Sequence, residues 1–195
     1  MSSFGTIILL CSLLANPLFT SGQSPAAVLD TTGRALKAGT QYYILPTGTS
    51  NGGGATLINR GSCPLFVGLD NNVGTTGLSV IFTPFRTGET TIRESRDFRV
   101  RFTGATTCVQ STQWGLETEP SSSERTLIST RSGNNTGAVH FRIEKDGRSY
   151  KMVWCPTDVC PLCKFRCGDL GIYIENGKRL LSLYDPALPV VFRRA

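Results

Sequence analysis

Four cysteines close together near the C-terminus are the residues of this chain best suited to covalent or metal chemistry. Cys155, Cys160, Cys163 and Cys167 follow the pattern C-x4-C-x2-C-x3-C. Thiolates at such spacings can bind zinc, a CxxC pair can act as a redox dithiol, and in an oxidising compartment the same side chains form disulfides. Structural zinc usually takes its ligands from two separated knuckles, and a redox CxxC lies at a helix N-terminus. The pattern therefore favours disulfides.

The start of the chain indicates which compartment applies. Residues 1–33 contain no Lys or Arg, and residues 7–15 form a short apolar run followed by small and polar residues. The run is too short to span a bilayer and is typical of a secretory signal, with cleavage after Gly22. We therefore expect residues 1–22 to be a cleaved signal peptide. The mature chain, residues 23–195, is expected to be secreted or vacuolar, without a membrane as partner.

Loss of the signal leaves an even number of cysteines. Cys11 leaves with the signal, so the mature chain keeps six of the seven cysteines, and Cys63 and Cys108 join the cluster of four. Six cysteines can form three disulfides in fifteen pairings, and their spacing does not choose among them. We expect no metal site.

Two other groups of residues carry less chemistry than their types suggest. His140 is the only histidine, so a catalytic set would have to be built around it, and we expect neither an enzyme nor a cofactor. A basic run is interleaved with acidic residues: Arg93, Glu94, Arg96, Asp97, Arg99 and Arg101. The net charge of +6 permits a nucleic-acid partner without selecting one. Interleaved charges are more typical of a solvated strand face, so nucleic acid is not expected as a partner.

Short strands are the elements expected to position these residues. The composition is 39% hydrophobic and 17% charged, with 21 Gly and 10 Pro, which favours turns over long helices. Phe98, Val100 and Phe102 alternate with Arg99 and Arg101, as in a strand with one face on a core. Comparable patterns predict strands at residues 41–46, 55–59, 65–69, 78–82, 98–102, 112–116, 126–130, 138–144, 149–154, 171–174, 179–183 and 189–193.

Turn signals separate these strands. Asn-Gly at 51–52 and 176–177, Asp-Gly at 146–147 and Asn-Asn-Thr-Gly at 134–137 are typical of hairpins. The last of them holds an N-glycosylation sequon, which predicts a glycan at Asn134. About twelve short strands predict an all-β protein, either a closed barrel or a β-trefoil, with a sandwich as the alternative.

A set of ordered sequence blocks covers most of the chain. The blocks are residues 28–36 (VLDTTGRAL), 42–46 (YYILP), 63–65 (CPL), 141–145 (FRIEK), 150–151 (YK), 155–156 (CP), 167–172 (CGDLGI) and 179–183 (RLLSL). In this order they resemble the Kunitz soybean-type trypsin inhibitors of plants. The resemblance covers residues 28–195, and the cysteine cluster with the ending at 190–195 is most similar to the miraculin-like subgroup. It implies one domain, residues 23–195, folded as a β-trefoil of twelve strands in three pseudo-repeats.

The resemblance also implies how the cysteines pair. The implied disulfides are Cys63 with Cys108, Cys155 with Cys167, and Cys160 with Cys163 inside that loop. Because all six mature cysteines are then used within the chain, we expect a monomer.

The function implied by the resemblance is inhibition of endopeptidases by a secreted protein in plant defence. In the family, the bond presented to the protease follows a residue at a characteristic distance after the first mature cysteine, usually Arg or Lys in trypsin inhibitors. Arg86 occupies that place. The reactive-site loop would then comprise Pro84, Phe85, Arg86, Thr87 and Gly88, and a trypsin-like serine protease would be the partner. Such a loop must be held firmly, so that little binding free energy is lost in ordering it.

Two residues depart from that pattern and leave alternatives open. Archetypal inhibitors hold the loop with an Asn where this chain has Ala38, and Gly88 adds backbone freedom just after the proposed scissile bond. One alternative is inhibition of papain-like cysteine proteases through other loops. Another is a storage or stress role without inhibition. Carbohydrate binding, as in trefoil lectins, is disfavoured by the sequence blocks.

Overall fold

Twelve strands and two short 3-10 helices form the regular structure of the described residues. The computed structural model describes residues 24–104, 108, 111–118, 125–130 and 136–195. The expected signal peptide at residues 1–22 and the sequon residue Asn134 lie outside them. None of the helices among the described residues could span a bilayer.

The strands follow one another at short intervals along the chain. They are β1 (Gln41–Pro46), β2 (Ala55–Ile58), β3 (Phe66–Leu69), β4 (Val80–Pro84), β5 (Phe98–Phe102), β6 (Gly115–Thr118), β7 (Thr126–Ser129), β8 (Arg142–Asp146), β9 (Ser149–Trp154), β10 (Gly168–Glu175), β11 (Lys178–Leu183) and β12 (Val190–Arg194). The 3-10 helices are η1 (Thr49–Asn51) and η2 (Thr136–Val139).

Six of the strands close into a ring. β1 pairs with β12 and with β4, β4 with β5, β8 with β9, and β9 with β12, all antiparallel. A bridge between Phe98 at the start of β5 and Phe141 just before β8 joins β5 to β8 and closes the ring. Side chains that point into the ring therefore share one core.

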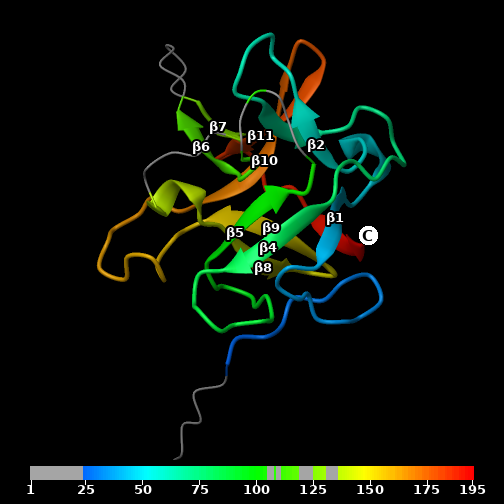
Figure 1. Cartoon of the computed structure of the whole chain (residues 1–195). Coiled ribbons are helices and arrows are strands. Elements are labelled where there is room, and N and C mark those ends of the chain that lie inside the picture. The colour runs from blue at the N-terminus through cyan, green and yellow to red at the C-terminus, as the bar shows by residue number, and fades with distance from the viewer. Residues whose placement is uncertain (1–23, 105–107, 109–110, 119–124, 131–135) are drawn as a thin grey trace, which may run out of the picture.

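The other six strands form three hairpins that cap the ring. The hairpins are β2–β3, β6–β7 and β10–β11, and they meet where β3, β7 and β11 pair with one another (Figure 1). Each run of four strands along the chain thus supplies two ring strands and one hairpin of the cap. This arrangement is a β-trefoil of three pseudo-repeats and confirms the predicted fold class.

Large aromatic side chains fill the ring. Phe82, Phe98 and Phe192 are at most 1% exposed. The ring of Phe82 lies 5.2 Å from that of Phe98 and 5.7 Å from that of Phe192, both in edge-to-face geometry. Such pairs add about 0.5–1.5 kcal/mol to the free energy gained by burial. The alternation in β5 is as predicted, since Arg99 and Arg101 are exposed between three buried residues.

The cap needs a glycine where β3 meets β11. Gly68 pairs with Leu180, and a Cβ atom added to Gly68 would lie 2.0 Å from the carbonyl oxygen of Arg179. Only a residue without a side chain allows the two strands to come this close.

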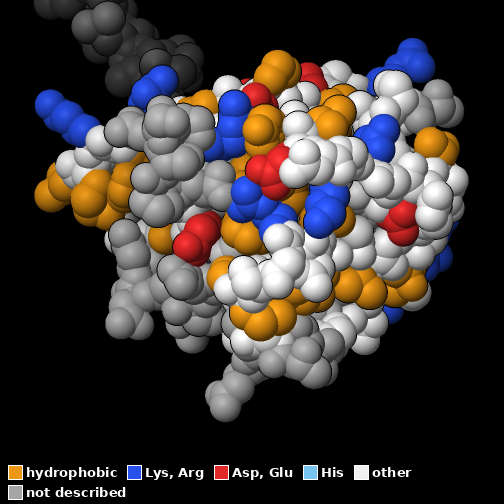
Figure 2. Space-filling model, turned by 90° about the horizontal axis from the view of Figure 1, so that it is seen from above, with side chains coloured by type: hydrophobic (Ala, Val, Ile, Leu, Met, Phe, Trp, Pro, Cys, Tyr) orange, Lys and Arg blue, Asp and Glu red, His pale blue; other side chains and the backbone are white. Residues whose placement is uncertain are grey.

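The outer surface of the cap carries side chains of several kinds. In Figure 2, which views the molecule from above, Lys and Arg side chains lie among acidic and hydrophobic ones. Arg60–Glu175 and Arg125–Asp185 are ion pairs of the cap hairpins and their flanking residues.

Two of the predicted hairpin turns are present and a third differs. Asn176 and Gly177 adopt positive φ values of 48° and 74° in the two-residue turn between β10 and β11, and Gly147 (φ 55°) follows β8. The Asn-Gly pair at 51–52 instead ends η1, on a longer connection between β1 and β2. Local turn chemistry alone does not give the length of the connection.

Several predicted strands begin too early, and the strand that leads into β8 does so by the most residues. The sequence predicts a strand at 138–144, but residues 136–139 form η2 and β8 starts at Arg142. The carbonyl oxygen of Gly137 accepts hydrogen bonds from Trp154 Nε1 at 3.0 Å and from the His140 backbone at 3.3 Å. These long-range and local contacts stabilise a turn where the residue types favour a strand.

Candidate functional site

The segment between β4 and β5 holds the proposed reactive-site residues. Pro84 ends β4 opposite Phe98, and the Phe85 backbone N–H donates to the carbonyl oxygen of Asp97 at 2.8 Å. The chain then turns sharply: Glu89 N donates to Arg86 O at 3.3 Å, and Gly88 has a φ of 86°. Gly88 thus supplies the positive φ that this turn requires. The loop lies in Figure 1 on the side of the ring away from the cap.

Arg86 is the cation that this turn presents. Its side chain is 53% exposed, and its guanidinium lies 3.8 Å from Asp158 Oδ1, a long ion pair. Asp158 is largely buried, but a pair at this distance with a half-exposed partner contributes no more than about 1 kcal/mol. Arg86 can therefore leave Asp158 for a binding pocket at little cost in free energy.

The return leg of the loop is held by the N-terminal segment. Ala38 N donates to Thr90 O at 2.9 Å, Ile92 N donates to Leu36 O at 2.9 Å, and Lys37 Nζ donates to Thr91 Oγ1 at 2.8 Å. Ala38 therefore touches the loop through its backbone. Its methyl group cannot make the side-chain hydrogen bond that an Asn could make from this position.

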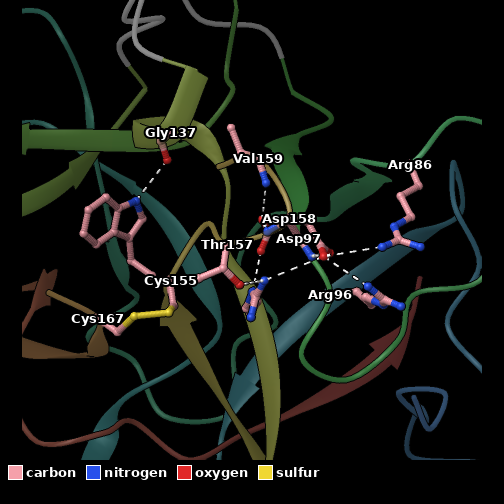
Figure 3. Close-up of polar contacts among 11 residues, drawn as sticks. Arg86, Arg96, Asp97, Gly137, Cys155, Thr157, Asp158, Val159 and Cys167 are labelled. Carbon is pink, nitrogen blue, oxygen red and sulfur yellow. Dashed lines mark hydrogen bonds and ion pairs between the residues drawn. A yellow bond between two sulfur atoms is a disulfide. The ribbon is translucent and has the colours of Figure 1, made fainter. Parts of the chain in front are cut away.

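A buried carboxylate ties the end of the loop to the cysteine cluster. The Asp97 side chain is fully buried and pairs with Arg142 Nε. Its Oδ2 accepts backbone N–H groups of Asp158 at 2.7 Å and Val159 at 3.0 Å. In return, Asp97 N donates to Asp158 Oδ2 at 3.1 Å, and Arg96 donates to Asp158 Oδ1 at 3.0 Å (Figure 3). A buried charge with this number of partners is stable, because each partner offsets its lost hydration.

This network, which we call the Asp97 brace, consists of Asp97, Asp158, Arg96 and Arg142. It joins the residue before β5 to the segment 155–167 between β9 and β10. Phe85 adds an apolar contact, because its ring lies edge-on to His140 with centroids 5.2 Å apart. The loop is thus fixed to the body of the protein at both ends, while Arg86 at its turn stays half-exposed.

Six cysteines of the described residues form three disulfides in the structure. Cys63 is bonded to Cys108, Cys155 to Cys167, and Cys160 to Cys163. This is the pairing that the family resemblance implies. Two of the bonds close the segment 155–167 that carries Asp158, so they also hold one side of the Asp97 brace. Among the described residues, no group of three or more His, Cys, Asp or Glu side chains is placed to bind a metal ion.

The basic run is divided differently from the prediction. Arg99 and Arg101 lie on a solvated strand face, but Arg96 belongs to the Asp97 brace and Arg93 donates to Pro25 O at 2.9 Å. Asp97 is buried rather than solvated. Asp97, an acidic residue inside a basic run, was the one local signal for the brace. Its partner Asp158 lies 61 residues away in the sequence.

A sequence match to a hydrolase motif lacks the required context. Residues 48–52 read G-T-S-N-G, which fits the G-x-S-x-G pattern of serine hydrolases. In those enzymes the serine sits on a sharp turn from a strand into a long helix. Here the stretch contains only the three-residue η1, which leads on to β2. The motif therefore does not support hydrolase activity.

A family model described as trypsin and protease inhibitor, of the legume Kunitz type, matches residues 28–194. The chain belongs to the Kunitz family of protease inhibitors. Its relatives include Kunitz type trypsin inhibitor 104 of Medicago truncatula, 46% identical over 174 residues, covering 86% of this chain and 87% of that one. Miraculin of Synsepalum dulcificum is 34% identical over 208 residues, covering 98% and 94%.

A solved structure extends the comparison to another class of target. The Kunitz-type cysteine protease inhibitor from potato superposes with a TM-score of 0.74 at 28% identity, covering 88% of this chain and 98% of that one. Members of the Kunitz family thus carry names that refer to trypsin and to cysteine proteases on the same fold. The family establishes a protease-inhibitor ancestry, and the names of its members refer to more than one class of target.

Proposed function

We propose that this Kunitz protein inhibits trypsin-like serine proteases, with Arg86 entering the primary specificity pocket. The observation that carries the proposal is a half-exposed arginine on a turn whose two ends are fixed to the protein. An arginine in such a pocket makes charge-assisted, bidentate hydrogen bonds to a carboxylate, and desolvated contacts of this kind dominate interface energies.

The fixed ends of the loop support an inhibitor rather than a substrate. A loop that is already ordered loses little conformational entropy on binding, so more of the contact energy appears as affinity. After cleavage, both new chain ends would still be held, one through β4 and the other through Ala38, Lys37 and the Asp97 brace. Binding draws the Arg86 carbonyl away from its long hydrogen bond with Glu89 N and toward the protease.

The proposal is tested by inhibition assays with the mature chain against trypsin. Arg86→Ala should weaken inhibition by about 2 kcal/mol or more, which is roughly thirtyfold in Ki. Arg148→Ala is the matched control, since Arg148 is an exposed arginine in the turn between β8 and β9. If Arg86→Ala inhibits trypsin as well as the parent protein does, Arg86 is not the contact residue.

A second candidate is inhibition of papain-like cysteine proteases through other loops. The likeness to the potato inhibitor and the methyl group of Ala38 in place of a loop-holding side chain favour it. Parallel assays against papain separate the two. Inhibition of papain that survives Arg86→Ala, together with weak inhibition of trypsin, would favour this candidate.

We also propose that the mature protein is a secreted or vacuolar monomer that lacks residues 1–22 and carries a glycan at Asn134. The support lies in the apolar run at 7–15 and in the sequon. N-terminal sequencing and mass spectrometry of protein made in plant cells, before and after deglycosylation, test both processing steps.

A further inference from the structure

Arg99 and Arg101 are the part of the basic run that the inhibitor function leaves unexplained. Both project from β5 to the outside of the ring and are exposed. Neither side chain has an ion pair or a hydrogen bond with any residue that the structure describes. By contrast, Arg93 and Arg96 in the preceding loop both have partners.

A cleft of 170 Å³ lies between these two side chains. Its lining is completed by Thr83, Val100 and Gln113. The register of β4 and β5 places Thr83 opposite Arg99, and a β-bridge places Gln113 opposite Arg101. Each arginine of the cleft therefore has a neutral polar side chain beside it.

The lining of the cleft is rich in free hydrogen-bond donors. It combines two guanidinium groups, the hydroxyl of Thr83 and the side-chain amide of Gln113, and it contains no carboxylate. Like the two arginines, the Thr83 hydroxyl and the Gln113 amide have no partner within the described part of the chain. A cleft with this chemistry attracts an anion and repels a cation.

The spacing of the arginines suits a small oxyanion. Side chains two residues apart on a strand share one face and are separated by about 6.6 Å along it. Two cations at this spacing repel each other unless an anion lies between them. Arginine hydrogen bonds to phosphate-type oxygens are about 2.7–2.9 Å long, so one tetrahedral anion can accept from both sides at once.

We propose that Arg99 and Arg101, with Thr83 and Gln113, bind a tetrahedral oxyanion of the sulfate or phosphate class. The group is either a free ion or an ester on a larger molecule. Arg99 and Arg101 supply charge and bidentate hydrogen bonds, while Thr83 and Gln113 donate to the remaining oxygens.

The test uses two double variants that lose the same charge. Arg99→Gln with Arg101→Gln removes the cleft arginines. Arg148→Gln with Arg194→Gln removes two exposed arginines outside it. Sodium phosphate and sodium sulfate are titrated into each protein at constant ionic strength, with NMR detection of the Gln113 side-chain amide. The unfolding temperature without added anion verifies that each variant is folded.

The parent and the control should show saturable shifts of the Gln113 amide, and the cleft variant should bind about tenfold or more weakly, because it loses charged hydrogen bonds. Retention on immobilised dextran sulfate tests the ester form. If the cleft variant elutes at lower salt than the control, an ester is bound as well. If only the free ions distinguish the variants, the ligand is a free ion. Equal behaviour of the two double variants with all three probes would overturn the proposal.

Discussion

Asp97 illustrates how a single buried carboxylate can position a binding loop. It is fully buried, pairs with Arg142 and accepts two backbone N–H groups from the segment closed by Cys155 and Cys167. Asp97 therefore joins the loop that presents Arg86 to a disulfide-bonded segment that lies about 60 residues later in the sequence. The Arg86 side chain contributes little to holding the loop, because its one ion pair is long. It is therefore available to a partner.

Replacement of Asp97 by Asn should be strongly destabilising. The amide keeps the shape of the side chain but removes the buried counter-ion at Arg142 Nε and leaves Arg142 only a long ion pair with Asp158 at 4.0 Å. Breaking a buried pair in this way costs about 3–5 kcal/mol. Urea denaturation measures the fall in the free energy of unfolding. Asp146→Asn, an exposed acidic residue at the end of β8, should change it by less than about 0.5 kcal/mol. Equal effects of the two substitutions would contradict the role of the brace.

The hydrogen bonds of the Asp30 carboxylate predict that the stability of the fold falls in acid. Burial by itself raises the pKa of Asp30, but hydrogen bonds from the Thr32 hydroxyl and from the backbone N–H groups of Arg34 and Thr32 lower it below the usual value for an aspartate. A carboxyl whose pKa is lowered in the folded state stabilises the fold above its unfolded pKa. This contribution is lost as the pH falls through the folded pKa.

Asp30→Asn should therefore reduce stability near neutral pH and flatten the decrease in stability below about pH 4. Thermal unfolding measured from pH 7 to pH 2 tests this directly. The two unfolding curves should converge at the acid end. A constant difference across the range would mean that the Asp30 charge is not responsible.

At the scale of elements, the return leg of the β4–β5 loop offers a gain of function. Ala38 lies beside Thr90 and is joined to it only by a backbone hydrogen bond. In Ala38→Asn, the new amide can donate to the loop backbone, and one such bond typically contributes about 0.5–1.5 kcal/mol. Inhibition of trypsin should tighten by a corresponding amount in Ki. Arg34→Asn, an exposed position in the same N-terminal segment, should leave Ki unchanged.

The strands show which parts of the fold can be predicted from local sequence. β5 was predicted at its observed bounds because Phe98, Val100 and Phe102 alternate with two arginines. The strand predicted at 138–144 was wrong at its start because the distant Trp154 side chain stabilises a turn at Gly137. Residue types report local preference, and a single contact from another strand can outweigh it.

The candidate site was predicted in part for the same reason. Sequence resemblance singled out Arg86 and the segment around it, since both lie within one stretch of chain. The Asp97 brace was missed, because Asp97 and Asp158 are neither close in sequence nor part of any motif. The cleft at Arg99 and Arg101 also depends on pairing with β4 and with Gln113, which composition does not reveal.

At the scale of the whole molecule, three hairpins and a six-stranded ring share one large core, and a smaller cluster of Phe66, Leu127 and Leu180 lies where the hairpins meet. Stability therefore depends on long-range links. The disulfides differ greatly in the length of chain that they close: 45 residues for Cys63–Cys108, 12 for Cys155–Cys167 and 3 for Cys160–Cys163. A cross-link lowers the entropy of the unfolded chain more when the closed loop is longer. The three bonds should therefore contribute unequally.

Paired replacement by Ala tests this order. From the loop lengths, removal of Cys63 and Cys108 should cost about 4 kcal/mol, removal of Cys155 and Cys167 about 3 kcal/mol, and removal of Cys160 and Cys163 less than either. Denaturation by guanidinium chloride gives the three free energies of unfolding. The Cys155/Cys167 variant should also weaken protease inhibition, because that bond closes the segment carrying Asp158, whereas the Cys63/Cys108 variant should retain inhibition wherever it is folded. If the Cys160/Cys163 variant were the least stable of the three, closure of the unfolded chain would not be what these bonds contribute.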